Sequence, residues 1–76
     1  MLAINITFKD YSDRTYWIDK ISSQYICKTQ DQFKNGILSN VKKQGSFKHY
    51  LQATQCLNKL INRDIEEKNI VEIVII

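Results

Sequence analysis

The sequence of 76 residues contains no proline, two glycines, one histidine and two cysteines. Two glycines cannot supply a glycine-rich loop that cradles phosphates, so nucleotide binding by such a loop is excluded. One histidine and two cysteines cannot complete a four-ligand structural zinc site unless carboxylates or a second chain contribute. Because proline is missing, the chain also lacks one of the residues that protect the exposed edges of β-sheets.

Long apolar runs are also missing. No run is longer than Ile73 to Ile76, which is far shorter than the about 20 residues that a membrane-spanning helix needs. The N-terminus lacks the basic segment and apolar core of a secretory signal. We therefore expect a soluble, cytoplasmic protein that does not act on membranes. In that compartment Cys27 and Cys56 are expected to be reduced thiols rather than a disulfide.

The length and composition indicate one folded domain, residues 1–76. The hydrophobic fraction of 43% and the charged fraction of 25% are ordinary for a globular protein. A domain of this size buries only about 60% of the surface of its unfolded chain, so its stability is small without further support. Since no metal or cofactor site is evident, oligomerisation is the expected support.

The C-terminal segment 70–76 is the most apolar part of the chain, and only Glu72 interrupts it. Both alternating sets of side chains are apolar, which is typical of a strand that is covered on both faces. The segment is predicted to be an inner strand, or an edge strand that a second copy of the protein covers. We accordingly predict a homodimer whose interface contains Ile73, Val74 and Ile75.

The rest of the chain predicts a ββααβ order. Residues 2–8 alternate as a half-buried strand, and 15–21 are rich in β-forming residues, although their spacing also permits a helix. Residues 24–28 are either a short strand or the approach to a helix. A first helix is expected from the cap Thr29 to Gly45, and a second from the cap Ser46. The predicted fold class is α+β: two helices on one face of a small antiparallel or mixed sheet of order 2-1-3.

Charge is distributed unevenly along the chain, whose net charge is +3. Residues 28–63 carry seven basic side chains and one acidic one, whereas residues 64–76 carry one basic and four acidic. On the second predicted helix a basic and amide stripe contains no carboxylate, although surface helices usually mix both signs. This stripe fits a solvated face, an acidic patch on a protein, or phosphates. Its predicted partner-binding residues are Lys48, Gln52, Gln55, Lys59 and Arg63.

Two neighbouring aromatic residues, Tyr16 and Trp17, point to opposite faces if 15–21 is a strand. One of them would then lie under the helices, and the other on the open face of the sheet. Because tyrosine and tryptophan often dominate binding energy at interface centres, both are candidate partner-binding residues. The sequence does not decide which of them faces outward.

No arrangement of potential catalytic residues in the sequence supports an enzymatic function. His49 has no nearby acid to orient it, and Cys56 lies two helical turns away on the same predicted helix. The acidic residues Glu66, Glu67 and Glu72 are interpreted as solvated charges. The Gly45-Ser46 junction resembles that of a helix-turn-helix only weakly, because strands surround the two predicted helices.

The function expected from these patterns is that of a small non-enzymatic binding protein without a cofactor. It would block the working surface of a macromolecular partner, most simply a protein, by steric means. Its size and composition resemble those of phage or mobile-element inhibitors of host defence systems. The alternative is a nucleic-acid-binding accessory protein. In that case the residues expected to contact phosphates are Lys42, Lys43, Lys48, Lys59 and Arg63.

Overall fold

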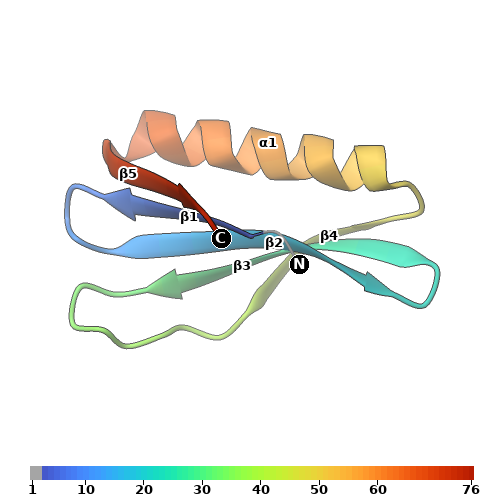
Figure 1. The fold of residues 1–76 in the computed structure, drawn as a ribbon, viewed down its shortest axis with the longest axis horizontal. Coiled ribbons are helices and arrows are strands. Elements are labelled where there is room, and N and C mark those ends of the chain that lie inside the picture. Colours follow the sequence, from blue (N-terminus) through green and yellow to red (C-terminus); the bar gives the residue numbers. More distant parts are fainter. Residues whose placement is uncertain (1–2) are drawn as a thin grey trace.

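The computed structural model describes residues 3–76, which form one helix and five strands (Figure 1). Their bounds, in chain order, are β1 Ala3–Phe8, β2 Asp13–Ile21, β3 Gln24–Gln32, β4 Lys42–Phe47, α1 Tyr50–Glu67 and β5 Ile70–Ile75.

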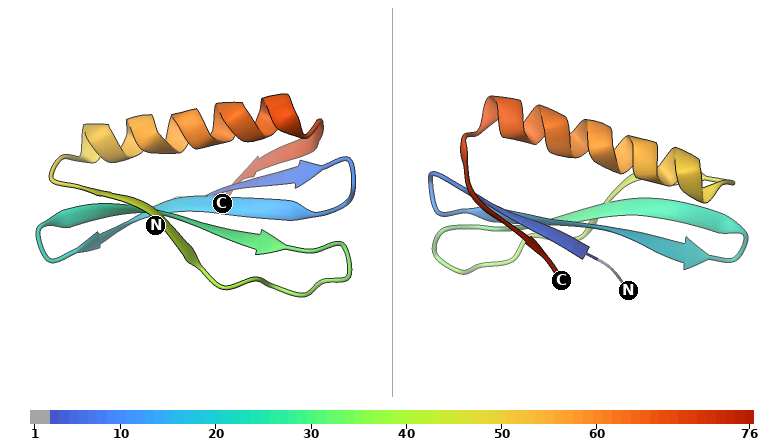
Figure 2. Two further views of the ribbon diagram at one scale, coloured as in Figure 1. Left: turned by 180° about the vertical axis from the view of Figure 1, so that it is seen from behind. Right: turned by 45° about the horizontal axis from the view of Figure 1, so that its top comes forward.

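The five strands form one antiparallel sheet of order β4-β3-β2-β1-β5. β1, β2 and β3 are joined by short turns, and β3 is joined to β4 by the loop 33–41. From β4, at one edge, the chain runs back through α1, which lies along one face of the sheet, to β5 at the other edge (Figures 1 and 2). The opposite face of the sheet carries no helix within residues 3–76.

Local turns set the pairing of the first three strands. Asp10 accepts a hydrogen bond from the backbone N–H of Ser12 (3.0 Å), and Tyr11 has a positive φ of 67° between β1 and β2. Ser22, with φ of 57°, begins the two-residue turn between β2 and β3, where Ile21 pairs with Gln24. Two-residue hairpin turns favour positive φ because this matches the twist of the strands.

The core lies between α1 and the sheet. Alternate residues of the strands face the helix, and the buried apolar side chains are Ile6, Phe8, Tyr16, Cys27, Ala53 and Leu57. α1 supplies Ala53 and Leu57 at a spacing of four residues, as expected for one face of a helix. Burial of these side chains fixes which face of each strand points towards α1.

The predicted fold class is wrong. The structure has five antiparallel strands and one helix, not two helices packed on a three-stranded sheet. Residues 29–45 do not form a helix: Thr29 is buried in β3, and 33–41 is a loop with Gly36 at φ 87°. The apolar residues at helical spacing in this segment, Phe33, Ile37, Leu38 and Val41, are exposed.

Pairing explains this error. All nine residues of β3 pair with β2. This pairing stabilises the strand more than the local sequence favours a helix, and Gly36 already lowers that helix propensity. Ser46 belongs to β4 and is not a helix cap, since α1 begins at Tyr50 with His49 as its N-cap. Of the two positions predicted for segment 70–76, the inner one is wrong and the edge one is confirmed, because β5 is an edge strand. That a second copy covers this edge stays a prediction.

Other predicted elements are confirmed. The strands predicted at 2–8 and 15–21 correspond to β1 and β2, within the part of the chain that the structure describes. Segment 24–28 is part of a strand, and β1 lies between β2 and the C-terminal strand, as expected. Within residues 3–76 no helix is both long and apolar enough to cross a membrane.

Candidate functional site

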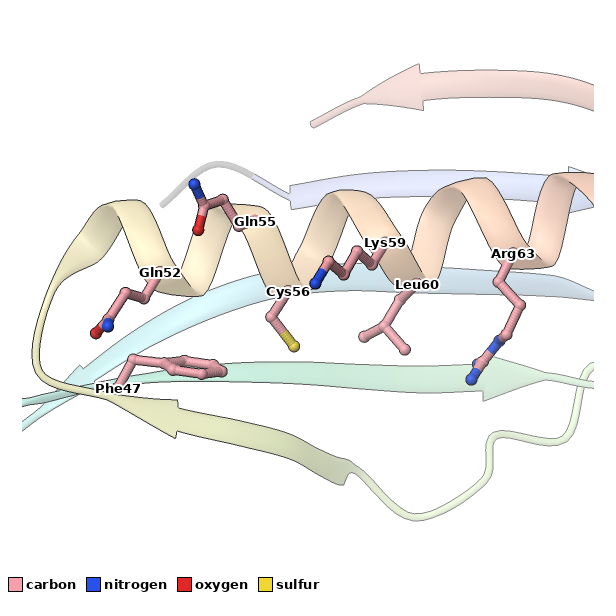
Figure 3. Close-up of a pocket in the computed structure, with 7 residues that line it drawn as sticks. All are labelled: Phe47, Gln52, Gln55, Cys56, Lys59, Leu60 and Arg63. Atoms are coloured by element: carbon pink, nitrogen blue, oxygen red, sulfur yellow. The ribbon is translucent and has the colours of Figure 1, made fainter.

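A basic groove lies between α1 and the edge strand β4, above β3 (Figure 3). Its volume is about 450 Å³, and none of its seven lining residues is acidic. The lining residues are Phe47 from β4 and Gln52, Gln55, Cys56, Lys59, Leu60 and Arg63 from α1. We call this site the basic groove.

Helical spacing brings the polar residues of the groove together. Gln52, Gln55, Lys59 and Arg63 follow one another at three or four residues, so they form a row along α1. In Figure 3 the side chains of Gln52 and Arg63 point towards β3 and β4, whereas that of Gln55 points away from these strands. All four are exposed. The row therefore forms a polar rim that solvent and a partner can reach.

The two cations of the rim differ in their surroundings. Arg63 lies 3.3 Å from the Oδ1 atom of Asp64, which partly neutralises its charge. Lys59 forms no ion pair with any of the residues 3–76. Lys42 and Lys43 of neighbouring β4 are also exposed and unpaired within this part of the chain. The side of the molecule around β4 is therefore positively charged and lacks internal compensation.

The floor of the groove is apolar. Phe47, Cys56 and Leu60 are partly buried and pack against the core. The ring of Phe47 lies beside Gly45, where an added Cβ would be 2.8 Å from two ring carbons. A side chain at position 45 would therefore displace the ring. Glycine at this position permits the ring to lie close to the backbone of β4 and to form part of the floor.

A buried polar network fixes the C-terminal half of α1 on the sheet. Asp64, whose side chain is 3% exposed, accepts hydrogen bonds from Arg14 (Nη1–Oδ2, 2.7 Å) and from Tyr16 (Oη–Oδ2, 2.6 Å). Arg14 also forms an ion pair with Asp31 of β3 through Nε and Nη2. We call Arg14, Tyr16, Asp31 and Asp64 the core network. Because Arg63 also bonds Asp64, the network extends to the rim of the basic groove.

The core network shifts the pKa values of its members. Burial raises the pKa of the Asp64 carboxyl, but hydrogen bonds from Tyr16 and Arg14 and the positive charges of Arg14 and Arg63 lower it by more, so it stays below its ordinary value. The pKa of Tyr16 is raised by burial and by the carboxylate of Asp64. The hydrogen bond with Asp31 is the main cause that raises the pKa of Arg14. Asp64 and Arg14 are therefore charged at neutral pH, and Tyr16 keeps the proton that it donates to Asp64.

The two cysteines are free thiols at the boundary of core and groove. Cys27 is buried in β3, whereas Cys56 of α1 is half-buried in the groove floor. Burial is the main cause that raises the pKa of the Cys27 thiol, and the neighbouring Cys56 is the second cause. A thiol with a raised pKa is a poor nucleophile, so Cys27 behaves as an apolar core residue.

The predicted partner-binding residues lie in four places. The basic groove contains Gln52, Gln55, Lys59 and Arg63, while Lys48 is exposed in the connection before α1 and does not line it. Tyr16 is completely buried under the helix and is not accessible to a partner. Trp17 lies on the open face, half-exposed, since it alternates with Tyr16 along β2. The predicted dimer residues Ile73, Val74 and Ile75 lie on edge strand β5 and are exposed.

Sequence reasoning missed the apolar floor and the core network. The floor combines residues from β4 and α1, and β4 was predicted to be helical. The network could have been noticed from Asp64, a carboxylate seven residues after Leu57 and therefore on the core face of the helix. A charge at such a position requires a buried partner. Arg14 and Asp31 could not have been assigned without the strand register.

No group of three metal-ligating side chains within residues 3–76 is placed to hold a metal ion. In comparisons with protein families, curated proteins and solved structures, nothing matches the chain. The candidate site is therefore assigned from its geometry and charge alone.

Proposed function

We propose that the protein is a small, non-enzymatic, cytoplasmic binding protein that holds an acidic segment of a partner protein in the basic groove. The observation that carries the proposal is the convergence of Gln52, Lys59 and Arg63 around the apolar floor of Phe47, Cys56 and Leu60. Carboxylates would bond the cations and amides, and an apolar side chain of the segment would cover the floor.

The floor favours a protein segment over nucleic acid. A nucleic acid offers phosphates to the cations and a base to the ring of Phe47, but nothing to the aliphatic and thiol surface of Leu60 and Cys56. A peptide supplies carboxylates and apolar side chains together. Lys59 forms no ion pair within residues 3–76, so its charge is available to an incoming carboxylate. Lys42 and Lys43 would steer acidic partners towards this side of the molecule.

Binding of this kind would act by steric blocking. A rigid domain with a radius of gyration of 12.5 Å covers a partner's surface around the bound segment. Phage or mobile-element inhibitors of host defence are one class of proteins that would act in this way. The predicted homodimer is part of the same proposal and is supported by the exposed apolar edge strand β5.

The test compares three fluorescent probes: a glutamate–tyrosine copolymer, polyglutamate and single-stranded oligothymidylate. We expect the copolymer to bind most tightly, and fluorescence anisotropy measures each affinity at low and high salt. Lys59→Glu should weaken copolymer binding by about tenfold or more, because a carboxylate replaces a rim cation. Lys9→Glu is the matched control, since it makes the same charge change at an exposed site outside the groove.

Equal effects of Lys59→Glu and Lys9→Glu would refute the groove as the binding site. Tight binding of oligothymidylate with a steep loss in salt, and no binding of the copolymer, would replace the acidic segment with nucleic acid. Copolymer and polyglutamate of equal affinity would show that the apolar floor contributes nothing, and would also contradict the proposal.

A further inference from the structure

The outer edge of β5 presents unpaired backbone groups. Ala3 and Ile76 exchange two backbone hydrogen bonds, of 3.1 and 2.8 Å, across the β1–β5 ladder. Bonded and non-bonded pairs alternate along an antiparallel ladder, so Asn5 and Val74 form the next bonded pair. The N–H and C=O groups of the intervening residues Ile73 and Ile75 therefore point away from β1.

The side chains of β5 are apolar on both faces of the sheet. Ile73 and Ile75 lie on the helix side, opposite Ile6 and Ile4 of β1, and are 49% and 67% exposed. Val74 lies on the other face and is 42% exposed. α1 leaves these side chains uncovered because it packs mainly over β2, β3 and β4. An apolar edge strand without lysine or proline is unprotected against pairing with another strand.

We infer that β5 pairs antiparallel with β5 of a second copy, about a two-fold axis that passes through Val74; this rests on the homodimer of the proposed function and does not depend on the acidic partner. In this register Ile73 of each copy exchanges two hydrogen bonds with Ile75 of the other. The two five-stranded sheets then form one continuous sheet of ten strands. Since an antiparallel pair of identical strands has its axis perpendicular to the sheet, both helices lie on the same face.

A second copy fits this edge because the segment is self-complementary in that register. Val74 meets Val74, and the isoleucines of the helix side meet each other, as an isologous interface requires. Glu72, the one charged residue of β5, lies opposite Ile76 at either end of the paired segment, where water can solvate its carboxylate. The two Glu72 side chains are thereby kept apart. The pairing does not involve the basic groove, which lies at the opposite edge of the sheet.

Strand pairing of this length buries less than the about 800 Å² per partner of a standard interface, compared with a total exposed surface of 5269 Å². We therefore expect a dissociation constant of about 1–100 μM. Analytical ultracentrifugation over this concentration range should show a reversible monomer–dimer equilibrium of the wild-type protein. A monomer throughout the range would overturn the inference.

The sharpest variant is Ile75→Pro, which removes an outward N–H and leaves the hydrogen bonds to β1 intact. We expect it to remain folded by circular dichroism and to weaken dimerisation by about tenfold or more. A folded Ile75→Pro protein that dimerises as the wild type does would overturn the inference.

If Ile75→Pro does not fold, Ile75→Lys takes its place, since a lysine on an edge strand opposes pairing. Its matched control is Ile37→Lys, because Ile37 is 60% exposed in the loop 33–41 and the substitution is the same. Loss of dimer for Ile75→Lys alone supports the inference, and equal behaviour of both variants contradicts it.

Disulfide trapping tests the register. In the inferred pairing the two Val74 residues form a non-bonded pair with Cα atoms about 4.5 Å apart, within the range of a disulfide. Val74→Cys, made in a Cys56→Ser background, should therefore form a covalent dimer on oxidation. A dimer that forms without this cross-link would contradict the two-fold axis at Val74.

Discussion

The two edges of the sheet differ in almost every physical property. β4 carries Lys42 and Lys43, and its ladder with β3 shifts register between Cys27 and Lys28. β5 carries one charge, Glu72, and its ladder with β1 also shifts register once, between Thr7 and Phe8. Lysines oppose the addition of a further strand at β4, whereas the apolar edge of β5 lacks this protection. In the two proposals, the side of β4 would recognise a partner through side chains, and β5 would do so through its backbone.

The helix makes both edges depend on the same core. α1 follows β4 and precedes β5 in the chain, and Asp64 anchors it to β2 and, through Arg14, to β3. Changes in the core network should therefore affect both edges, whereas changes at one edge should leave the other as it is. Substitutions in the core network and at each edge test whether the two edges are independent of one another.

The largest effect is expected for Asp64→Ala. It leaves the partly buried guanidinium of Arg14, which still pairs with Asp31, and the buried hydroxyl of Tyr16 without their shared acceptor. This should lower the free energy of unfolding by about 2–4 kcal/mol. Urea denaturation followed by circular dichroism measures this loss. Binding in the groove and dimerisation should both decline as the folded fraction falls.

Glu66→Ala is the control for this prediction. Glu66 is an exposed carboxylate on the same helix and forms no ion pair within residues 3–76, so its removal should change stability little. Equal losses for Asp64→Ala and Glu66→Ala would show that the core network does not hold the helix on the sheet.

A smaller effect, confined to acid, is expected from pH. Because the pKa of Asp64 is lower in the folded protein than in the unfolded chain, its ionisation stabilises the fold above the unfolded pKa of about 4. This stability is lost as pH falls from that value through the folded pKa. Denaturation midpoints measured between about pH 2 and pH 7 should show the decline. Asp64→Asn should make the profile flatter, and an unchanged profile would contradict the assignment.

The smallest effect is expected for Gly45→Ala, which should change the groove beside β4 and leave the edge at β5 unchanged. The added methyl group displaces the ring of Phe47, at an expected cost of about 1 kcal/mol, and disturbs the groove floor. Copolymer binding should weaken a few-fold while the dimerisation constant stays unchanged. A parallel change in both constants would show that the two edges are coupled.

How far the fold follows from the sequence depends on how local each signal is. The alternation of residues 2–8 and the apolar spacing from Tyr50 to Ile61 are complete within their own segments, so β1 and much of α1 were predictable. Segment 29–45 carries a helical spacing as well, but its structure is decided by the ladder with β2. Such pairing depends on distant residues and is not visible in the local pattern.

The same distinction applies to the site. The polar row from Gln52 to Arg63 lies within one helix, so its members were recognised from their spacing. The floor needs Phe47 from a strand that sequence reasoning placed in a helix, and the core network joins residues 50 positions apart in the chain. Tyr16 and Trp17 were correctly expected on opposite faces, but only the position of α1 shows that Tyr16 is the buried one.

The long return of the chain through α1 also has a consequence for folding. β1, β2 and β3 are neighbours in sequence and can pair early, whereas β1 and β5 join the two ends of the described chain. Contacts of such high sequence separation form late, because closing the loop costs entropy first. Until β5 has been synthesised, β1 leaves the nascent chain with an unpaired edge beside Ile4 and Ile6. We therefore expect the chain to be more prone to aggregation before β5 pairs with β1 than it is afterwards.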